Sequence, residues 1–455
     1  MKKHVWLILW VLVAACQGKP VTIPIVDAAL NDTTSVFYTD FTTYPAHRNH
    51  LPIGVFDSGT GGLTVLEAIL ASRLLEGEDY IYLADQANMP YGNYAAEGKT
   101  GFLRELIIKD ALFLLGQQVK ILVVACNTAT AYGLEDITHY LESSGSGIKA
   151  IGVINAGVKA TLDKIDPRED VAVGILATAG TIASGGYEKT FRALAGERGY
   201  TGNLQVISHG AAGFAEAVDS EKDFVDPRAV SPRDDYRGPS TDHPLYKIDT
   251  NLLPAYGFDF FANHMLYNGS EEQPRDLQLN SAANYARYHL LSLVEKLRNV
   301  KDPQPLRYLV LGCTHFPYES KTLSLMLTEL REYEDNGEYP YRDLIDEKVT
   351  LIDPAFETAR ELYTSLVKDS LLSIKMGNTQ ASFYISVPRE GANLNGALDS
   401  TGRFSYAYKY GRNPGIFTQD VNIVPFSAQN IDSLTRERLQ SLRYTWPLLP
   451  FGSEN

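Results

Sequence analysis

The stretch ILVVACNT at residues 121–128 has a near copy at residues 308–315, which read YLVLGCTH. Each is an apolar run that ends in a small residue, a cysteine and, within two positions, a threonine. This pattern is typical of a buried parallel strand that turns into a helix. A second pair precedes them in the same order, with IGVFDSG at residues 53–59 and VGILATA at residues 173–179. Because two paired motifs recur in one order, we interpret the chain as a duplicated unit.

Segments with apolar residues at three- and four-residue spacing, as in amphipathic helices, alternate with these runs. They cover residues 63–75, 99–116, 284–297 and 358–367. Strands that alternate with helices predict an α/β fold, here with two pseudo-symmetric parallel-sheet domains. Ligands of such sheets bind at the carboxyl ends of the strands, where both cysteines of the repeat fall. The active site is therefore expected between the two domains.

Composition narrows the class of protein. The chain has 455 residues, 41 basic and 55 acidic side chains, a formal net charge of -14 and three cysteines. This length allows two or three domains of ordinary size. The acidic balance, without any basic run, argues against a nucleic-acid partner. Three cysteines are too few for a disulfide scaffold, and no apolar stretch reaches the ~18 residues that span a bilayer.

The amino terminus has the pattern of an export signal. Residues 1–15 combine a basic start with an apolar run and small residues, and they end at Cys16. The letters VAAC at residues 13–16 resemble the bacterial lipobox, in which the chain is cleaved before the cysteine and the cysteine is acylated. We expect a signal peptide over residues 1–15, a lipid anchor on Cys16 and a polar tether over residues 16–50. A plain cleaved signal or an uncleaved anchor is the alternative. The protein is expected on the periplasmic face of a bacterial membrane, the outer membrane if the host has one.

Two other segments lie outside the repeated unit. Residues 222–278 are rich in Pro, Asp, Tyr and Phe with little periodicity, and they account for the extra length of the second copy, so we predict an insertion there. Residues 371–455 contain alternating patterns typical of strands at residues 381–387 and 404–410, with Gly and Asn turns between them. A β-rich carboxyl-terminal extension is expected. The sequence leaves open whether it caps the site, packs on the core or faces a partner.

Cys126 and Cys313 are placed for chemistry. A thiol at the turn from a strand into a helix is positioned to become a thiolate. One cysteine would suggest covalent catalysis, whereas two facing one cleft from symmetric halves suggest paired proton transfer. One thiolate would remove a proton from carbon and the other thiol would return a proton to the opposite face, which inverts a stereocentre without a cofactor. A structural disulfide or two buried apolar thiols are the alternatives.

An ordered set of motifs resembles the glutamate racemases. The set consists of GVFDSGTGGL at residues 54–63, LAD at 83–85 with PYG at 90–92, ACNTA at 125–129, GILATAGTI at 174–182, GCTHFP at 312–317 and LIDP at 351–354. Together these motifs cover residues 51–370, apart from the insertion. Each motif alone is weak, but the ordered set is specific.

The resemblance implies cofactor-independent racemisation of glutamate by a two-base mechanism. It implies that Cys126 acts on the D enantiomer and Cys313 on the L enantiomer, assisted by Asp57 and His315. It also implies a third assistant, a glutamate, which residue counting places at Glu216, although the Cys-Pro that opens this segment in the family is absent here. The residues implied to hold the substrate are Ser58, Pro90, Tyr91, Gly92, Asn127, Thr128, Thr178, Thr181 and Thr314. No metal or cofactor is implied.

The resemblance also implies domain limits. The first racemase domain is expected over residues 51–152, completed by about 320–370, and the second over residues 153–319. Ala129 departs from the family pattern, which usually has Thr or Ser there, and so removes one hydroxyl from the expected site. An export signal is foreign to a family whose ordinary members supply D-glutamate for cell-wall precursors inside the cell.

Three functional interpretations follow. The first is an exported, lipid-anchored glutamate racemase related to peptidoglycan and the cell wall. The second keeps the fold and changes the substrate to aspartate or another cell-wall-derived amino acid, although His315 is typical of the glutamate branch. The third is a non-catalytic binding lipoprotein that retains the cleft. The oligomeric state stays open, with a homodimer among the options.

Overall fold

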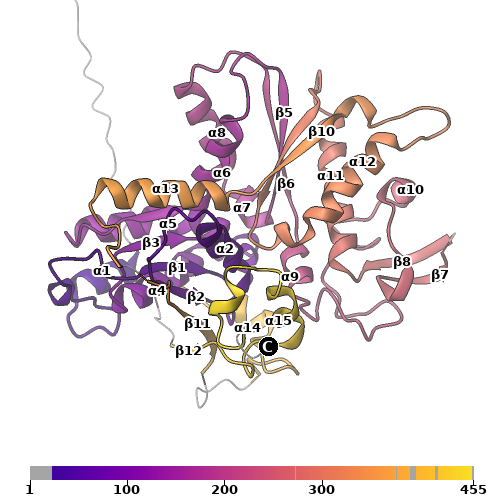
Figure 1. Cartoon of the computed structure of the whole chain (residues 1–455). Coiled ribbons are helices and arrows are strands. Elements are labelled where there is room, and N and C mark those ends of the chain that lie inside the picture. The colour runs from indigo at the N-terminus through magenta and orange to yellow at the C-terminus, as the bar shows by residue number, and fades with distance from the viewer. Residues whose placement is uncertain (1–22, 272, 376, 390–395, 416–418, 453–455) are drawn as a thin grey trace, which may run out of the picture.

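The computed structural model describes residues 23–271, 273–375, 377–389, 396–415 and 419–452. Two sheets organise the chain (Figure 1). The first sheet has the strand order β12-β11-β2-β1-β3-β4, and the second has the order β10-β9-β5-β6. The strands of the first sheet are β1 (Ile53–Asp57), β2 (Tyr80–Ala84), β3 (Ile121–Val124), β4 (Ala150–Gly152), β11 (Ala381–Pro388) and β12 (Val421–Pro425). Those of the second are β5 (Val171–Ala177), β6 (Leu204–Gly210), β9 (Leu306–Gly312) and β10 (Ile345–Ile352).

The predicted duplication is visible in the strand order. Within each copy the first strand lies between the second and the third, and the fourth lies outside the third, which gives β2-β1-β3-β4 and β6-β5-β9-β10. All neighbours within these two sets are parallel. The prediction of an α/β fold with two pseudo-symmetric parallel-sheet domains is therefore confirmed.

Helices cover both faces of each sheet, as buried parallel sheets require. Around the first sheet lie α2 (Leu63–Ala71), α3 (Tyr91–Ala96), α4 (Thr100–Gly116), α5 (Asn127–Ser143) and α13 (Ala355–Lys368). Around the second lie α6 (Val153–Leu162), α7 (Ala179–Ala183), α8 (Gly186–Glu197), α9 (Phe214–Val218), α11 (Ala282–Arg298) and α12 (Ser320–Glu332). Phe56 of β1 packs into the cluster beside α4, whereas Val55 packs into the cluster beside α2, so the strand feeds both cores.

The segment expected to complete the first domain divides between the two sheets. Strand β10 joins the second sheet and α12 packs on it, so residues 320–352 belong with the second domain instead. Only α13 returns to the first domain, where it packs against α2 and also touches α6. The sequence pattern could not assign these elements because parallel strands of the two copies look alike.

The insertion forms a small unit beside α11. It contains α10 (Leu253–Tyr256) and an antiparallel hairpin of β7 (Met265–Ser270) and β8 (Gln273–Leu279). Aromatic and aliphatic side chains of the insertion, among them Phe224, Tyr256 and Leu277, join the core cluster that also contains Tyr285 of α11. The insertion therefore extends the second domain's core.

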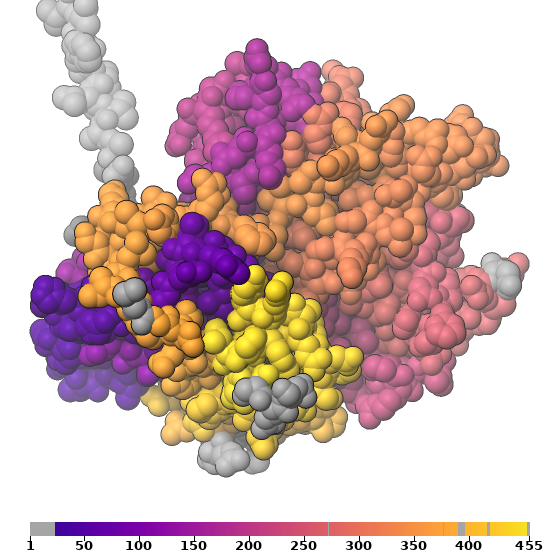
Figure 2. Space-filling model, viewed as in Figure 1, coloured from indigo at the N-terminus to yellow at the C-terminus, as the bar shows by residue number. Residues whose placement is uncertain are grey.

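The carboxyl-terminal extension is built into the first domain. Strand β11 pairs parallel with β2, and β12 pairs antiparallel with β11, so the extension lengthens the first sheet. Its apolar side chains, including Phe426, Leu439 and Phe451, share a core cluster with Val55 and Leu66. In the space-filling view the yellow carboxyl-terminal residues lie between the first domain and the second (Figure 2).

The strand predicted at residues 404–410 is a helix instead. Helix α14 (Tyr406–Gly411) begins after Ser405, whose Oγ accepts a hydrogen bond from the Tyr408 backbone N–H. Tyr406 and Tyr410 pack together with ring centroids 4.5 Å apart, as residues four apart on a helix do. Aromatic residues at every second position mimicked strand alternation, while the serine cap decided the local structure.

The expected tether is also corrected for its described part. Helix α1 (Pro24–Asn31) buries Ile25, Val26 and Ala29 against the core beside α4 and α5, and Tyr44 donates a hydrogen bond of 2.6 Å to the Leu115 carbonyl. Residues 23–50 therefore belong to the first domain. Cys16, the signal over residues 1–15 and the start of the tether lie outside the described residues. Among the residues that the structure describes, no helix is long and apolar enough to cross a membrane.

Ile25→Ala is expected to destabilise the protein by about 3 kcal/mol, because it removes a buried side chain from a packed core. The urea midpoint of unfolding measures the effect. Val36→Ala, which truncates a 72% exposed side chain in the same segment, is the matched control and should change stability little. If Ile25→Ala changes the stability as little as Val36→Ala, the segment is not packed on the domain and the tether interpretation is correct.

Candidate active site

Cys126 lies at the junction of β3 and α5. It is the N-cap of α5, and its Sγ accepts a hydrogen bond from the Ala129 backbone N–H at 3.4 Å. The thiol also lies 3.7 Å from Ser58 Oγ, to which it can donate. Burial, together with the nearby charge of Asp57, raises the pKa of the Cys126 thiol well above its ordinary value. At neutral pH this shift favours the protonated form of the thiol.

Cys313 occupies the equivalent place in the second copy, directly after β9. Its Sγ lies 3.7 Å from His315 Nδ1. Both cysteines are buried and free, so the structural disulfide considered from the sequence does not form here. The two thiols consequently have different neighbours, a carboxylate for Cys126 and an imidazole for Cys313.

The two cysteines line one small cavity between the domains. The first domain contributes Ser58, Met89, Pro90, Tyr91, Gly92, Cys126, Asn127 and Thr128, and the second contributes Thr178, Ala215, Cys313, Thr314 and His315. The cavity measures about 20 Å³, which is room for roughly one water molecule. A substrate as large as an amino acid can enter only if these walls move apart. The residues that the resemblance implied to hold the substrate all line this cavity, with the exception of Thr181.

Asp57 lies at the end of β1, buried below the cavity. Its Oδ2 accepts hydrogen bonds from the Gly62 backbone N–H at 2.7 Å and from the Thr314 hydroxyl at 3.2 Å. Burial raises the pKa of Asp57, and the imidazolium of His315 offsets only part of that rise. Through Thr314, this carboxyl links the first domain to the loop that holds the second cysteine.

His315 is buried beside Cys313, and its Nε2 lies 3.3 Å from Asp219 Oδ1. Burial alone would disfavour the imidazolium, but the Asp219 carboxylate outweighs burial and holds the pKa of His315 well above its ordinary value. A side chain at Gly61 would come within 2.5 Å of His315 Cε1, so only glycine allows the loop after β1 to close over this ring. The cation that faces Cys313 is thus fixed in place from both domains.

The acidic partner of His315 is Asp219, three residues after Glu216, which the resemblance implied as a third assistant in proton exchange. Glu216 lies inside α9, accepts a hydrogen bond from Asn93 at 3.1 Å and is absent from the cavity lining. Asp219 follows at the carboxyl end of the same helix, nearly one turn later. Residue counting cannot distinguish two positions three apart on one helix. The side chain of Asp219 is buried, with only 3% exposed.

Glu216 has its own pH signature. Burial, reinforced by Glu221, raises its pKa from 4.5 to about 7. A carboxyl whose pKa is higher when folded contributes stability that is full below the unfolded pKa and lost as the pH rises through the folded one. Glu216→Gln removes that loss and should stabilise the protein by roughly 3 kcal/mol at pH 9 and little at pH 4.

Thermal unfolding of the Glu216→Gln variant at both pH values measures this difference. Glu197→Gln, at an exposed position, is the control and should show no pH-dependent gain. An equal gain at both pH values for Glu216→Gln would contradict the assignment.

Three threonines form a hydroxyl cluster where α5 meets α7. Thr128 Oγ1 lies 3.0 Å from both Thr178 Oγ1 and Thr181 Oγ1, and these two lie 2.9 Å apart. Thr181 is fully buried and does not line the cavity, so it supports the other two hydroxyls. Asn127 Oδ1 accepts a hydrogen bond from Tyr187 at 2.6 Å, a contact that no local sequence pattern indicated. The amide is thereby oriented with its NH₂ group free for other acceptors.

Tyr91 contributes differently from the expected hydroxyl donor. Its hydroxyl lies 2.6 Å from carboxyl oxygens of both Asp85 and Asp110. One phenol proton cannot serve two carboxylates, and burial with the nearby Asp85 charge raises the pKa of Asp110 well above its ordinary value. Asp110 therefore carries the second proton. The Tyr91 hydroxyl is committed to this buried network, which fixes the chain at Pro90 and Gly92.

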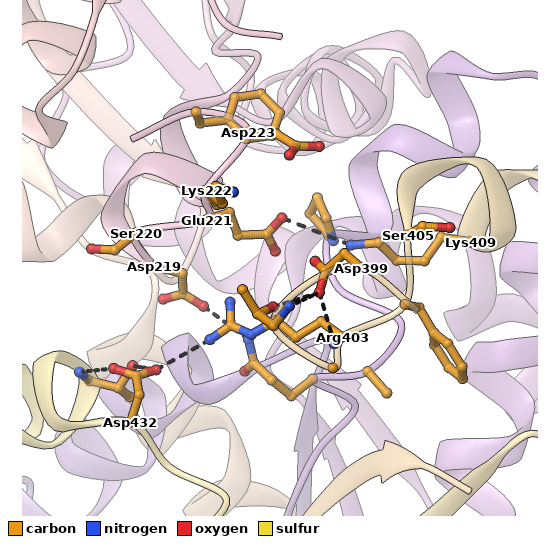
Figure 3. A pocket seen from close by; sticks show the side chains of 18 of the residues that line it. Asp219, Ser220, Glu221, Lys222, Asp223, Asp399, Arg403, Ser405, Lys409 and Asp432 are labelled. Atoms are coloured by element: carbon orange, nitrogen blue, oxygen red, sulfur yellow. Dashed lines mark hydrogen bonds and ion pairs between the residues drawn. The ribbon is translucent and has the colours of Figure 1, made fainter. Parts of the chain in front are cut away.

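A larger chamber of about 1070 Å³ adjoins the cavity lined by the two cysteines and shares Pro90 with it. The start of the insertion and the carboxyl-terminal extension build most of its walls (Figure 3). An ion pair joins these two walls, with Glu221 Oε2 3.8 Å from Lys409 Nζ, and a second pair lies within the extension, between Arg403 and Asp432 at 3.3 Å (Figure 3). The insertion and the carboxyl-terminal extension thus enclose the chamber beside the cavity. No group of three or more metal-ligating side chains occurs among the residues described.

Comparison with known proteins gives one consistent result. No protein-family model matches the chain. A glutamate racemase of Oceanobacillus iheyensis is 42% identical over 137 residues, which cover 30% of this chain and 45% of that protein. Glutamate racemase 1 of Caldanaerobacter subterraneus is 26% identical over 339 residues, covering 74% of this chain and 88% of that protein. The chain thus spans about half the length of the first of these relatives and most of the second.

Among solved structures, glutamate racemase isoform RacE1 from Bacillus anthracis is similar, with 27% sequence identity and a TM-score of 0.45. The match covers 74% of this chain and 88% of that structure.

Proposed function

We propose that this chain, a homologue of glutamate racemases over about 74% of its length, is an amino-acid racemase that interconverts L- and D-glutamate. The observation that carries the proposal is the pair of free cysteines, Cys126 and Cys313, at equivalent positions of two duplicated domains that line one cavity. The chemistry needs no cofactor, because the two thiols supply the base and the acid.

The neighbours of each thiol support opposite starting states. His315 Nδ1 lies 3.7 Å from Cys313 Sγ, whereas burial and the charge of Asp57 raise the pKa of the Cys126 thiol. Starting from L-glutamate, the Cys313 thiolate removes the α-proton and Cys126 delivers its own proton to the opposite face. The enzyme then holds Cys313 as thiol and Cys126 as thiolate. The reverse reaction begins from that state, or solvent exchange resets it.

Neutral donors hold the substrate in this proposal. The described residues that line the cavity include no lysine or arginine, so the carboxylates and the developing carbanion are met by hydroxyls, the Asn127 amide and backbone N–H groups. Thr128 and Thr178 contact each other from opposite domains. Movement of the two domains toward each other would therefore also bring these hydroxyls to the substrate. The net charge of -14 adds no attraction for an anionic substrate.

Circular dichroism tests the proposal. The full chain, kept reduced, is incubated with L-glutamate and, in a second set, with D-glutamate, and the signal of each should decay to zero. L-aspartate is the parallel arm. If the circular dichroism signal decays with aspartate and not with glutamate, the substrate is aspartate. If it decays with neither amino acid, the racemase proposal is refuted and the non-catalytic interpretation is favoured.

We also propose that Cys16 carries a lipid anchor that holds the domain at the membrane surface. The VAAC letters at residues 13–16 support it, and residues 17–22 alone separate Cys16 from the packed segment that starts at Ile23. Such a short connection would keep the first domain close to the lipid. Cys16→Ala should move the protein from the membrane fraction to the soluble fraction and abolish labelling by a fatty-acid probe. Retention of both would refute the anchor.

A further inference from the structure

Arg438 brings a charge from the carboxyl-terminal extension to the catalytic site. It lies in α15 (Ser433–Leu439), and one terminal nitrogen of its guanidinium lies 2.7 Å from Asp219 Oδ1. That nitrogen also donates to Thr60 Oγ1 at 3.1 Å, and the other terminal nitrogen donates to the Val218 carbonyl at 2.6 Å. The side chain is 15% exposed and that of Asp219 is 3% exposed. Residues far apart in the sequence thus meet at one buried ion pair.

Asp219 is the middle of a chain of contacts that ends at a reacting sulfur. Arg438 pairs with Asp219, Asp219 pairs with His315 at 3.3 Å, and His315 lies 3.7 Å from Cys313 Sγ. The other polar group that contacts Asp219 is the Gln86 amide, at 3.3 Å. Within the described part of the chain, Tyr82, Tyr318 and Glu221 also interact electrostatically with Asp219, and Asp57 does so with His315.

Charge balance depends on Arg438. A carboxyl buried this deeply would by itself favour its protonated form, but Arg438, with His315, holds the pKa of Asp219 well below its ordinary value. An ionised Asp219 in turn stabilises the imidazolium of His315. Without the guanidinium, Asp219 and His315 could neutralise each other by moving one proton. The cation facing Cys313 would then be lost.

We propose that Arg438 is a positioning residue of the racemase site, through which the carboxyl-terminal extension keeps Asp219 ionised and His315 cationic beside Cys313. The proposal rests on the proposed function for its catalytic consequence, but the link from Arg438 to the Cys313 thiol stands on its own contacts. It gives the extension a role in catalysis beyond packing on the first sheet.

Contacts other than those of Arg438 also hold the extension on the first domain. Arg412, buried in the same extension, pairs with Asp420 at 2.6 Å and donates to Asn88 and Tyr94 of the first domain. Strand β11 is paired along β2. A neutral replacement at position 438 therefore tests electrostatics more than folding.

The test is the pH dependence of Cys313 alkylation by iodoacetamide, read on the full chain by peptide mass spectrometry. Because the thiolate is the nucleophile, Arg438→Gln should slow alkylation of Cys313 at pH 7 about tenfold and move its pH profile upward. Arg438→Lys should restore most of the rate. Arg403→Gln removes a half-exposed arginine of the same extension and is the matched control, with an unchanged profile expected.

Racemisation gives the second readout. Arg438→Gln should lower kcat about tenfold or more with little change in KM, because the variant alters a proton-transfer group rather than a substrate contact. An unchanged Cys313 profile in folded Arg438→Gln would overturn the proposal and leave Arg438 as a structural tie. If that variant does not fold, Asp219→Asn tests the same link, and the same upward shift is required of it.

Alkylation needs no substrate. A wild-type protein that fails to racemise glutamate would therefore refute the proposed function while the thiol profile still decides the role of Arg438.

Discussion

Cys126→Ser is expected to lower glutamate racemisation by about 10⁴-fold, because a serine hydroxyl neither donates nor accepts the α-proton at neutral pH as a thiol does. Under the proposed mechanism, Cys313 keeps its His315 neighbour in this variant, removes the α-proton of L-glutamate and, once its S–H has exchanged with D₂O, delivers deuterium back to the same face. L-glutamate should therefore gain α-deuterium from D₂O without forming D-glutamate. Mass spectrometry after chiral separation measures both.

Cys313→Ser is the mirror experiment. It should lower racemisation equally while D-glutamate, and not L-glutamate, exchanges its α-proton. Cys16→Ser changes the third cysteine of the chain, which lies outside the described residues; it is the control and should leave racemisation of the purified protein unchanged. Racemisation at a near wild-type rate by the Cys126→Ser variant or by the Cys313→Ser variant would contradict the two-base mechanism.

Asp57→Asn is the second large effect. The carboxyl is buried, and its charge helps to keep the proton on Cys126. The amide should lower kcat about 10²-fold, because Cys126 loses the group that assists its proton exchange. It should also lower the pKa of the Cys126 thiol, because a repelling charge is removed.

The two readouts for Asp57→Asn move in opposite directions. Alkylation of Cys126 should become faster at neutral pH while racemisation becomes slower. Asp163→Asn, at a surface position paired with Arg198, provides the control and should change neither rate. Slower alkylation of Cys126 in Asp57→Asn would show that the carboxyl acts as a base toward this thiol and not as a repelling charge.

Local patterns predicted the core of the fold well. Each strand of the duplicated unit is an apolar run closed by its own small-residue turn, so β1, β3, β5 and β9 and the positions of Cys126 and Cys313 could be read from neighbouring letters alone. The resemblance then supplied a set of polar residues, and most of them do line one cavity. These features could be predicted because each depends on a few neighbouring residues, whose apolar and small-residue pattern is visible in the sequence.

Long-range contacts were the part that could not be predicted. Arg438 meets Asp219 only because α15 folds back beside α9, and no spacing in the sequence records that return. The Tyr187 contact to Asn127 likewise crosses between the domains. Helix periodicity does not separate Glu216 from Asp219, and contacts with the distant residues His315 and Arg438 distinguish Asp219. The packing of Ile25 was hidden because a short polar and Pro-containing segment has the composition of a tether.

The most direct measurement of the central claim follows isotope during the first turnovers of the reduced, full-length protein. L-glutamate with protium at the α-carbon is supplied in D₂O, and both enantiomers are separated and weighed by mass spectrometry at early times. Two thiols on opposite faces predict D-glutamate that carries α-deuterium from the first turnovers, while the remaining L-glutamate is still largely protiated. D-glutamate that retains the original α-protium would mean that one group carries the proton across both faces, which would contradict the account.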